Sequence, residues 1–251
     1  MKKKHFNKPV LLLIAAAALL LASTVGSTQA ALTYYSENYS AEVTVANIGV
    51  TLLENDSEVG SRNYVLVDRA SETYGWDEVS GDLLSKMLAE GEKLVLGQKY
   101  AERISVKNSG EIDSYVRVIL TKSWQDADGK DTELSPALIK VDTLTNNGWI
   151  VDESASSPER VVLYYTNVLA SGAETPDCTE AISISTEIAK YVDKQVSEDG
   201  KTVTYDYTYN GYTFNLDAEV DAVQTHNAVD AIKSAWGVDV EVAADGSISL
   251  K

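Results

Sequence analysis

The chain has 251 residues, of which 44% are hydrophobic and 24% charged, a composition typical of one large globular domain. Its 38 acidic residues outnumber the 21 basic ones and give a net charge of −17, which excludes most nucleic-acid partners because the protein would repel the phosphates. One cysteine and two histidines exclude an intrachain disulfide and disfavour metal-dependent and acid–base enzymes, so we expect a non-enzymatic protein.

The N-terminus has the charge and hydropathy pattern of an export signal. Four lysines among the first eight residues precede an apolar run of 13 residues, Val10–Ala22. As a helix this run would be about 20 Å long, which is too short to cross a hydrocarbon core of about 30 Å. We therefore predict a signal peptide at residues 1–30, cleaved between Ala30 and Ala31, with membrane contact only before cleavage.

Cleavage would make the chain more acidic. It would remove four lysines and no acidic residue, which leaves 17 basic against 38 acidic residues and a net charge of −21. With Cys178 alone the exported chain would contain no internal disulfide, as in many secreted proteins of Gram-positive bacteria. We expect a secreted protein of the extracellular matrix or the cell surface.

Alternation of apolar and polar residues with a period of two predicts strands in most of the mature chain, 31–251. The alternation is clearest over Thr204–Asp217, and a second strand is expected at Tyr115–Trp124, with Arg117 on its solvent side. Many short strands between Gly, Asn and Asp turns predict one all-β domain with minor helices, an antiparallel jelly-roll or immunoglobulin-like β-sandwich. Further strands are expected at 39–45, 48–53, 99–107, 138–141, 161–165 and 181–191.

Local signals predict a hairpin and two helices. Asn210-Gly211 favours a type I′ turn and therefore a β-hairpin over Thr204–Asp217. A short helix is expected at Ser80–Ala89, within an inserted, partly helical excursion at about residues 55–92. A longer helix is expected at Asp221–Trp236, with an apolar side that includes His226 and packs on the sheet.

An acidic turn is the one candidate metal site. Asp126, Asp128, Asp131 and Glu133 resemble the start of an oxygen-ligand calcium loop, in which carboxylates converge beside a glycine. The bidentate acid of an EF-hand would fall at Ser135, however, and an Asp-rich hairpin turn explains the same residues without a metal. We expect no cofactor and keep calcium as the alternative.

Four other side chains are candidates for chemistry. Cys178 and His226 could form a nucleophile–base pair, but nearby acidic residues would raise the pKa of the thiol and weaken the nucleophile. Trp76 and Trp149 stand beside glycines in predicted loops, where they could stack on sugar rings or pack in satellite clusters. We therefore predict no catalytic residues.

Three segments carry recognisable patterns in a fixed order. Ala31–Glu37 reads Ala-Leu-Thr-Tyr-Tyr-Ser-Glu, and Ile104–Val118 contains Val-x-Asn-x-Gly-x-x-Asp-x-Tyr-Val-Arg-Val. Ala218–Asn227 reads Ala-Glu-Val-Asp-Ala-Val-Gln-Thr-His-Asn and is followed by Trp236. Together they resemble the exported matrix proteins of Gram-positive bacteria typified by TasA and camelysin, whose signal peptides are processed by a SipW-type signal peptidase.

The resemblance implies a jelly-roll-like sandwich, residence at the cell surface or in a biofilm matrix, and partners among matrix or cell-wall components. It also implies self-association into fibres, in which the N-terminal strand freed by cleavage completes the sheet of the next subunit. Camelysin-like members have been classed as metallopeptidases, although this sequence offers no ligand set for that activity. A metallopeptidase and a sugar-binding adhesin are the alternative functions.

The donor segment of such a fibre would be 31–46. An ordinary first strand that packs on its own domain explains the same pattern equally well. The side chains expected on one face of the donor strand are Tyr35, Tyr39, Ala41, Val43 and Val45.

Overall fold

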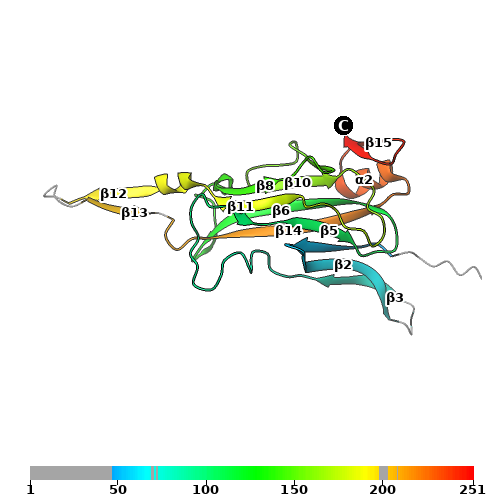
Figure 1. Ribbon diagram of the computed structural model, residues 1–251, viewed down its shortest axis with the longest axis horizontal. Helices are drawn as coiled ribbons and strands as arrows, with labels where there is room; N and C mark the ends of the chain where they lie inside the picture. Colours follow the sequence, from blue (N-terminus) through cyan, green and yellow to red (C-terminus); the bar gives the residue numbers. More distant parts are fainter. Residues whose placement is uncertain (1–46, 69–70, 72, 198–202, 208) are drawn as a thin grey trace, which may run out of the picture. The chain divides into compact units, whose positions relative to one another are not determined.

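The structure is a computed structural model that describes residues 47–251 except 69–70, 72, 198–202 and 208 (Figure 1). In this part of the chain every strand pairing is antiparallel and one α-helix is present, which confirms the all-β class with minor helices. The expected signal peptide, the Ala30–Ala31 bond, the donor segment and the strand at 39–45 lie outside the described residues. No described helix is both long and apolar enough to span a membrane.

Three sheets supply most of the strands. The first has the order β3-β2-β1-β5, the second β14-β6-β10-β9 with β7 added to β6, and the third β4-β11-β8. Their bounds are β1 Gly49–Glu54, β2 Ser57–Asp68, β3 Thr73–Val79, β4 Tyr100–Ala101, β5 Ile104–Asn108, β6 Ser114–Asp126, β7 Gly129–Asp131, β8 Ile139–Thr143, β9 Trp149–Val151, β10 Arg160–Tyr165, β11 Thr179–Ile184 and β14 Thr213–Gln224.

Two short ribbons and three helices complete the described elements. They are β12 Val192–Val196 with β13 Val203–Tyr207, β15 Val240–Val242 with β16 Ile248–Leu250, the helix α2 Ala228–Trp236, and the 3₁₀ helices η1 Pro136–Leu138 and η2 Thr186–Lys190.

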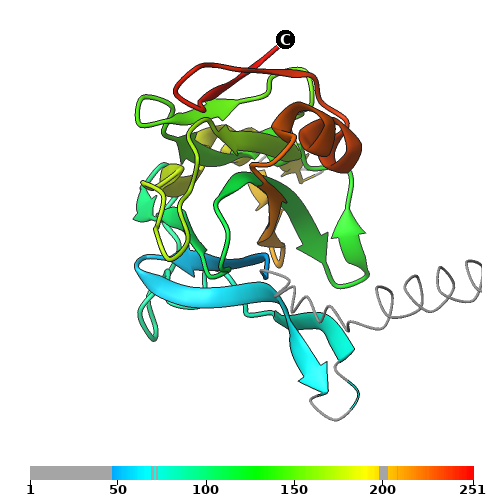
Figure 2. The same cartoon turned by 90° about the vertical axis from the view of Figure 1, so that its right-hand side faces the viewer.

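Side chains from all three sheets meet in one hydrophobic core, in a sandwich-like arrangement. As predicted, alternate residues of β6 face this core, where Val116, Val118 and Leu120 are completely buried. The opposite face of β6 was predicted to be solvated, but Tyr115 and Ile119 are buried under α2 and the β15–β16 ribbon. Figure 2 shows α2, in orange-red, beside the green strands of this sheet.

The predicted partly helical excursion at 55–92 is a β-hairpin followed by turns. β2 pairs with β1 on one side and with β3 on the other, so the hairpin extends the first sheet. The helix predicted at Ser80–Ala89 is absent. Leu84 has a left-handed φ of 62°, which an α-helix does not allow, and its N–H donates to the Glu54 carboxylate instead of to a helical carbonyl.

The predicted hairpin over Thr204–Asp217 is also wrong. A turn does form at Asn210-Gly211, because Tyr212 N–H donates to the carbonyl of Tyr209 at 3.1 Å and Gly211 has a φ of 86°. It is not the predicted type I′ turn, which requires a positive φ at Asn210 as well. The flanking strands then separate, because β13 pairs with β12 and β14 pairs along its whole length with β6. Long-range pairing therefore decides the partner of β14, whereas β13 pairs with β12, the strand that precedes it in sequence.

The C-terminal helix is shorter than predicted. Residues 221–224 continue β14, and α2 begins at Ala228 after Asn227, which adopts a left-handed φ of 56°. The predicted end is correct, because Gly237 caps the helix with a φ of 75°. His226 lies exposed in the turn before the helix and not on an apolar helix face.

Candidate functional site

The edge of β14 is the feature from which the candidate site is built. The strand pairs with β6 from Thr213–Gln125 to Gln224–Ser114, and no other strand of the described chain pairs with it. An edge strand presents a row of backbone N–H and C=O groups on its open side. β14 therefore offers a template on which a further strand could form.

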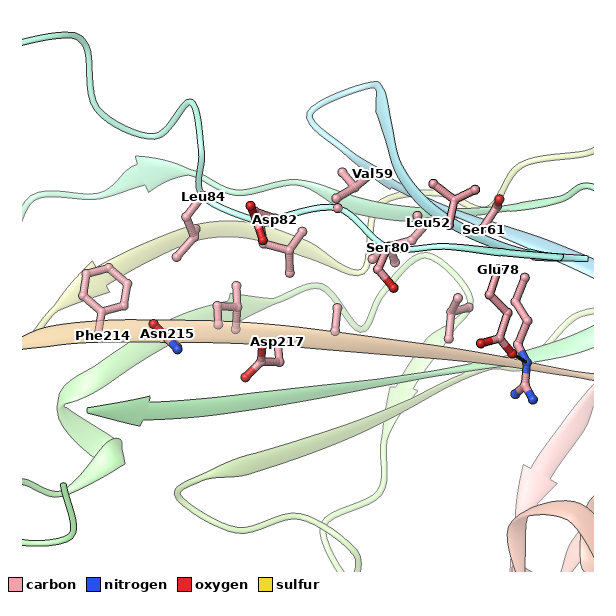
Figure 3. A pocket seen from close by; sticks show the side chains of 18 residues that line it. Leu52, Val59, Ser61, Glu78, Ser80, Asp82, Leu84, Phe214, Asn215 and Asp217 are labelled. Atoms are coloured by element: carbon pink, nitrogen blue, oxygen red, sulfur yellow. Dashed lines mark ion pairs between the residues drawn. The ribbon is translucent and has the colours of Figure 1, made fainter. Parts of the chain in front are cut away.

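A groove of about 590 Å³ runs beside this edge (Figure 3). We call it the β14 groove, and we call Ser80–Leu84, which follows β3, its wall segment. Figure 3 shows Leu84 and Phe214 at one end of the groove, Glu78 at the other, and Asp217 between them. Its lining consists of Leu52, Val59–Arg62, Glu78–Leu84, Phe214–Ala218 and Val220.

The β14 groove combines an apolar side with acidic rims. Leu52 and Leu216 belong to the hydrophobic core, and Phe214, Ala218 and Val220 are half-buried against it. The charged side chains of the lining are Arg62, Glu78, Asp82 and Asp217, with Arg62 Nε 2.8 Å from Glu78 Oε1. The groove thus suits an extended segment with alternating apolar side chains, whereas an acidic segment would meet repulsion there.

Two glycines allow the wall segment to approach β2. A Cβ on Gly81 would lie 2.3 Å from the carbonyl oxygen of Val59, and one on Gly60 would lie 2.9 Å from that of Val79. Real Cβ atoms do not approach backbone that closely. The absence of side chains at Gly60 and Gly81 therefore lets the wall segment lie close to β2, and this position sets the width of the groove there.

The residues of the candidate calcium loop hold turns in the structure. Asp126 Oδ1 accepts the N–H of Asp128 at 2.8 Å, and Asp131 Oδ2 accepts those of Glu133 and Leu134 at 3.1 and 2.8 Å. Among the described residues, no group of three or more acidic, histidine or cysteine side chains is placed to hold a metal ion. The Asp-rich hairpin turn, the other interpretation of this sequence, describes the β6–β7 connection.

The structure does not bring together the side chains that were candidates for catalysis or sugar binding. Cys178 is completely buried, and burial first, with a smaller contribution from the charge of Asp177, raises the pKa of its thiol. Trp149 is completely buried, and its Nε1 donates to the carbonyl of Pro176 at 2.8 Å, so it offers no ring face to a sugar. His226 is exposed on a turn outside the core.

Trp76 lies on an aromatic face of the β2–β3 hairpin that the sequence analysis missed. Pairing of Tyr64 with Trp76 and of Leu66 with Tyr74 places these four side chains on one face. Trp76 is 49% exposed, and its ring centroid lies 5.2 Å from that of Tyr64. Alternation over Arg62–Leu66 and Tyr74–Glu78 was the signal that could have revealed this face.

No protein-family model, curated protein or solved structure matches the chain. The resemblance to the TasA and camelysin family therefore stays a prediction that rests on the three sequence segments.

Proposed function

We propose that the protein is a secreted, non-enzymatic component of the cell surface or biofilm matrix, with a jelly-roll-like or immunoglobulin-like β-sandwich, that assembles by strand exchange. Segment 31–46 of one copy adds as a strand to β14 of the next and fills the β14 groove. The observation that carries this proposal is the open edge of β14 beside a groove with an apolar side.

The dimensions and the apolar side chains of the two partners correspond, whereas Glu37 and Glu42 of the segment are repelled by the acidic rims of the groove. The groove follows Phe214–Val220, seven residues that extend over about 23 Å as an antiparallel strand. Segment 31–46 contains more residues than this and alternates apolar side chains at Tyr39, Ala41, Val43 and Val45. A strand added there gains backbone hydrogen bonds along its length and buries every second side chain.

Charge sets the conditions for assembly. A chain of net charge −17, or −21 after the predicted cleavage, repels its copies, and the rims of the groove are acidic. Salt shortens the range of this repulsion to about 10 Å at 0.1 M. Assembly is therefore expected to increase with ionic strength, and light scattering that does not change with salt would contradict this explanation.

Cross-linking tests the proposed contact directly. The variants Val43→Cys and Asn215→Cys are made separately and mixed under oxidising conditions. The only natural thiol, Cys178, is buried and does not compete. We expect a dimer that contains one copy of each variant, whereas Glu153→Cys, in an exposed turn, should give none with Val43→Cys.

A groove-filling substitution provides the complementary test. Ala218→Tyr fills the β14 groove, whereas Ala222→Tyr lies four residues further on the same strand, outside the lining. We expect the first to abolish filaments in electron micrographs and the second to retain them, once both are shown to fold. Equal assembly of the two variants would refute the groove as the acceptor. A disulfide that forms only within the double variant Val43→Cys/Asn215→Cys would show that the segment packs on its own domain.

A second candidate function is sugar binding at the aromatic face of the β2–β3 hairpin. The exposed rings of Trp76 and Tyr74 favour it, whereas Trp149 is buried and takes no part. We expect Trp76→Ala to lose retention on insoluble cell-wall polysaccharide while Trp236→Ala retains it. Equal retention of wild type and Trp76→Ala would remove this function.

A further inference from the structure

Two glutamates face the protein interior where β1 ends. Glu54 and Glu102 are only 7% and 1% exposed. In the β1–β5 ladder Glu54 pairs with Ile104, and Glu102 precedes Ile104 by two residues. Residues two apart in an extended chain point to the same side, so the two carboxyl groups are diagonal neighbours on the core face of the sheet.

The two side chains have different partners. Glu54 Oε1 accepts the N–H of Leu84, in the wall segment of the β14 groove, at 2.6 Å. Neither carboxyl oxygen of Glu102 has a hydrogen-bond partner among the described residues. The backbone of Glu102 is fixed on both sides, because its N–H donates to the carbonyl of Glu180 and its carbonyl accepts the Thr179 hydroxyl at 2.6 Å. These bonds fix the backbone position of Glu102, from which its side chain is only 1% exposed.

Among the described residues around Glu54 and Glu102, no cationic side chain is placed to balance the charge if both carboxyl groups are ionised. Arg103 follows Glu102, but it pairs with Asp56 at 2.5 Å and lies 3.9 Å from Asp177. The charged side chains on the other elements packed nearby are exposed to water: Glu180 on β11, and Asp82 and Lys86 around the wall segment.

Burial is the main factor that raises the pKa of Glu102, to about 8, and the charge of Glu54 adds to it. An ionised carboxylate that is buried without partners is strongly unfavourable. At neutral pH the carboxyl group of Glu102 is therefore protonated.

We propose that Glu54 and Glu102 share one proton at neutral pH, and that this proton holds the wall segment of the β14 groove in place. The protonated Glu102 can donate its O–H to Glu54, which leaves Glu54 Oε1 free to accept from Leu84. When the proton leaves, two carboxylates repel each other in the interior, and the bond to Leu84 is the contact that can yield. This device regulates the groove, and only its effect on assembly rests on the proposed function.

The pH dependence of unfolding tests the shared proton. Between pH 5 and pH 8 the native chain binds one proton that the unfolded chain releases, so stability falls as pH rises. Relative to Glu102→Gln, the unfolding constant of the wild type should increase up to tenfold for each pH unit in this window. Glu180→Gln, the exposed control beside Glu102, should follow the wild type.

Hydrogen exchange tests the link to the groove. Above pH 8 the protection of the Leu84 amide should decrease at least tenfold in the wild type and stay constant in Glu102→Gln. If Glu102→Gln does not fold, Glu54→Gln serves instead, because it keeps an oxygen for Leu84 and removes the neighbouring charge. Its pH dependence should then move to lower pH.

Three results would overturn the proposal. One is a difference in stability between wild type and Glu102→Gln that does not change with pH. Another is unchanged protection of Leu84 above pH 8. A third is loss of the pH dependence when millimolar Ca²⁺ is added, which would make the pair a cation site. All measurements use unassembled full-length chain, so they succeed or fail independently of strand exchange.

Discussion

The side chains of Arg117 and Asp221 should show a large interaction energy in a double-variant cycle, because α2 and the sheet enclose their ion pair. Both the Nε and the Nη2 of Arg117 donate to Asp221 Oδ2, and the two side chains are only 13% and 18% exposed. The guanidinium also lies over the ring of Trp236, 5.4 Å from its centroid. We predict that the substitutions Arg117→Ala and Asp221→Ala, with the double variant, give a coupling energy of about 1.5–3 kcal/mol.

The chain supplies a matched control for this cycle. Arg62 and Glu78 also form a cross-strand pair, but their side chains are 47% and 56% exposed, so we expect a coupling of about 0.2–1 kcal/mol. The cycle removes the packing of each side chain from the comparison, because packing losses occur in the single variants as well.

Urea unfolding followed by circular dichroism measures both cycles. In 1 M salt the coupling of the exposed pair should largely disappear, whereas that of Arg117 and Asp221 should largely persist because a mostly buried pair is screened much less. Equal coupling in the two cycles, or equal loss with salt, would refute the argument from burial.

Three further predictions concern single buried groups. Cys178 should react with a thiol reagent only after unfolding, because it is completely buried and burial raises the pKa of its thiol; modification of the native chain within minutes would contradict this. Burial lowers the pKa of Lys122, whose Nζ donates to the Ile139 carbonyl at 2.7 Å. The native chain thus loses this proton before the unfolded chain does, so wild type should gain stability relative to Lys122→Met in urea titrations as the pH rises towards the ordinary lysine pKa. Trp149→Phe removes the donor to the carbonyl of Pro176 and should lower the free energy of unfolding by about 1–2 kcal/mol, with no loss of polysaccharide retention.

The strand Tyr115–Trp124 shows what sequence alone could predict. Its alternating apolar residues identified the core face correctly, because a long half-apolar strand has few other ways to bury them. The second layer was not predicted, since α2 and the β15–β16 ribbon reach β6 from more than 100 residues further along the chain. Arg117 was therefore assigned to solvent, although it lies in an enclosed ion pair.

The errors arose where a local signal competed with a distant partner. Asn210-Gly211 does make a turn, but β6 is longer than β13 and takes all of β14. Ser80–Ala89 has the leucine spacing of a helix, yet Leu83 and Leu84 pack on the core without one. In both regions the buried contacts outweighed the conformation that the local sequence prefers.

The candidate site was harder to predict than the core face of β6, because the β14 groove forms between segments that are distant in sequence. The wall segment, Ser80–Leu84, follows a strand of the first sheet, and Phe214–Val220 belongs to a strand of the second, so the groove depends on the packing of these two sheets. The alternation of Phe214, Leu216 and Ala218 indicated an apolar face, but nothing in it indicated that one edge of the strand stays open. The position of an edge is a property of the strand order, and one sequence does not reveal that order.

The acidic residues of β14 connect the open edge to the charge of the whole chain. Exposed edge strands tend to pair with each other, and charged side chains are a common protection. Asp217 and Glu219 are exposed on β14, so two such edges repel each other as well as any acidic strand that approaches. A proton or a salt reduces that repulsion, and the burial of apolar side chains from a segment in the correct register offsets part of it. Under the proposed strand exchange, we expect such an edge to stay unpaired in a dilute, low-salt solution and to pair where ions are concentrated.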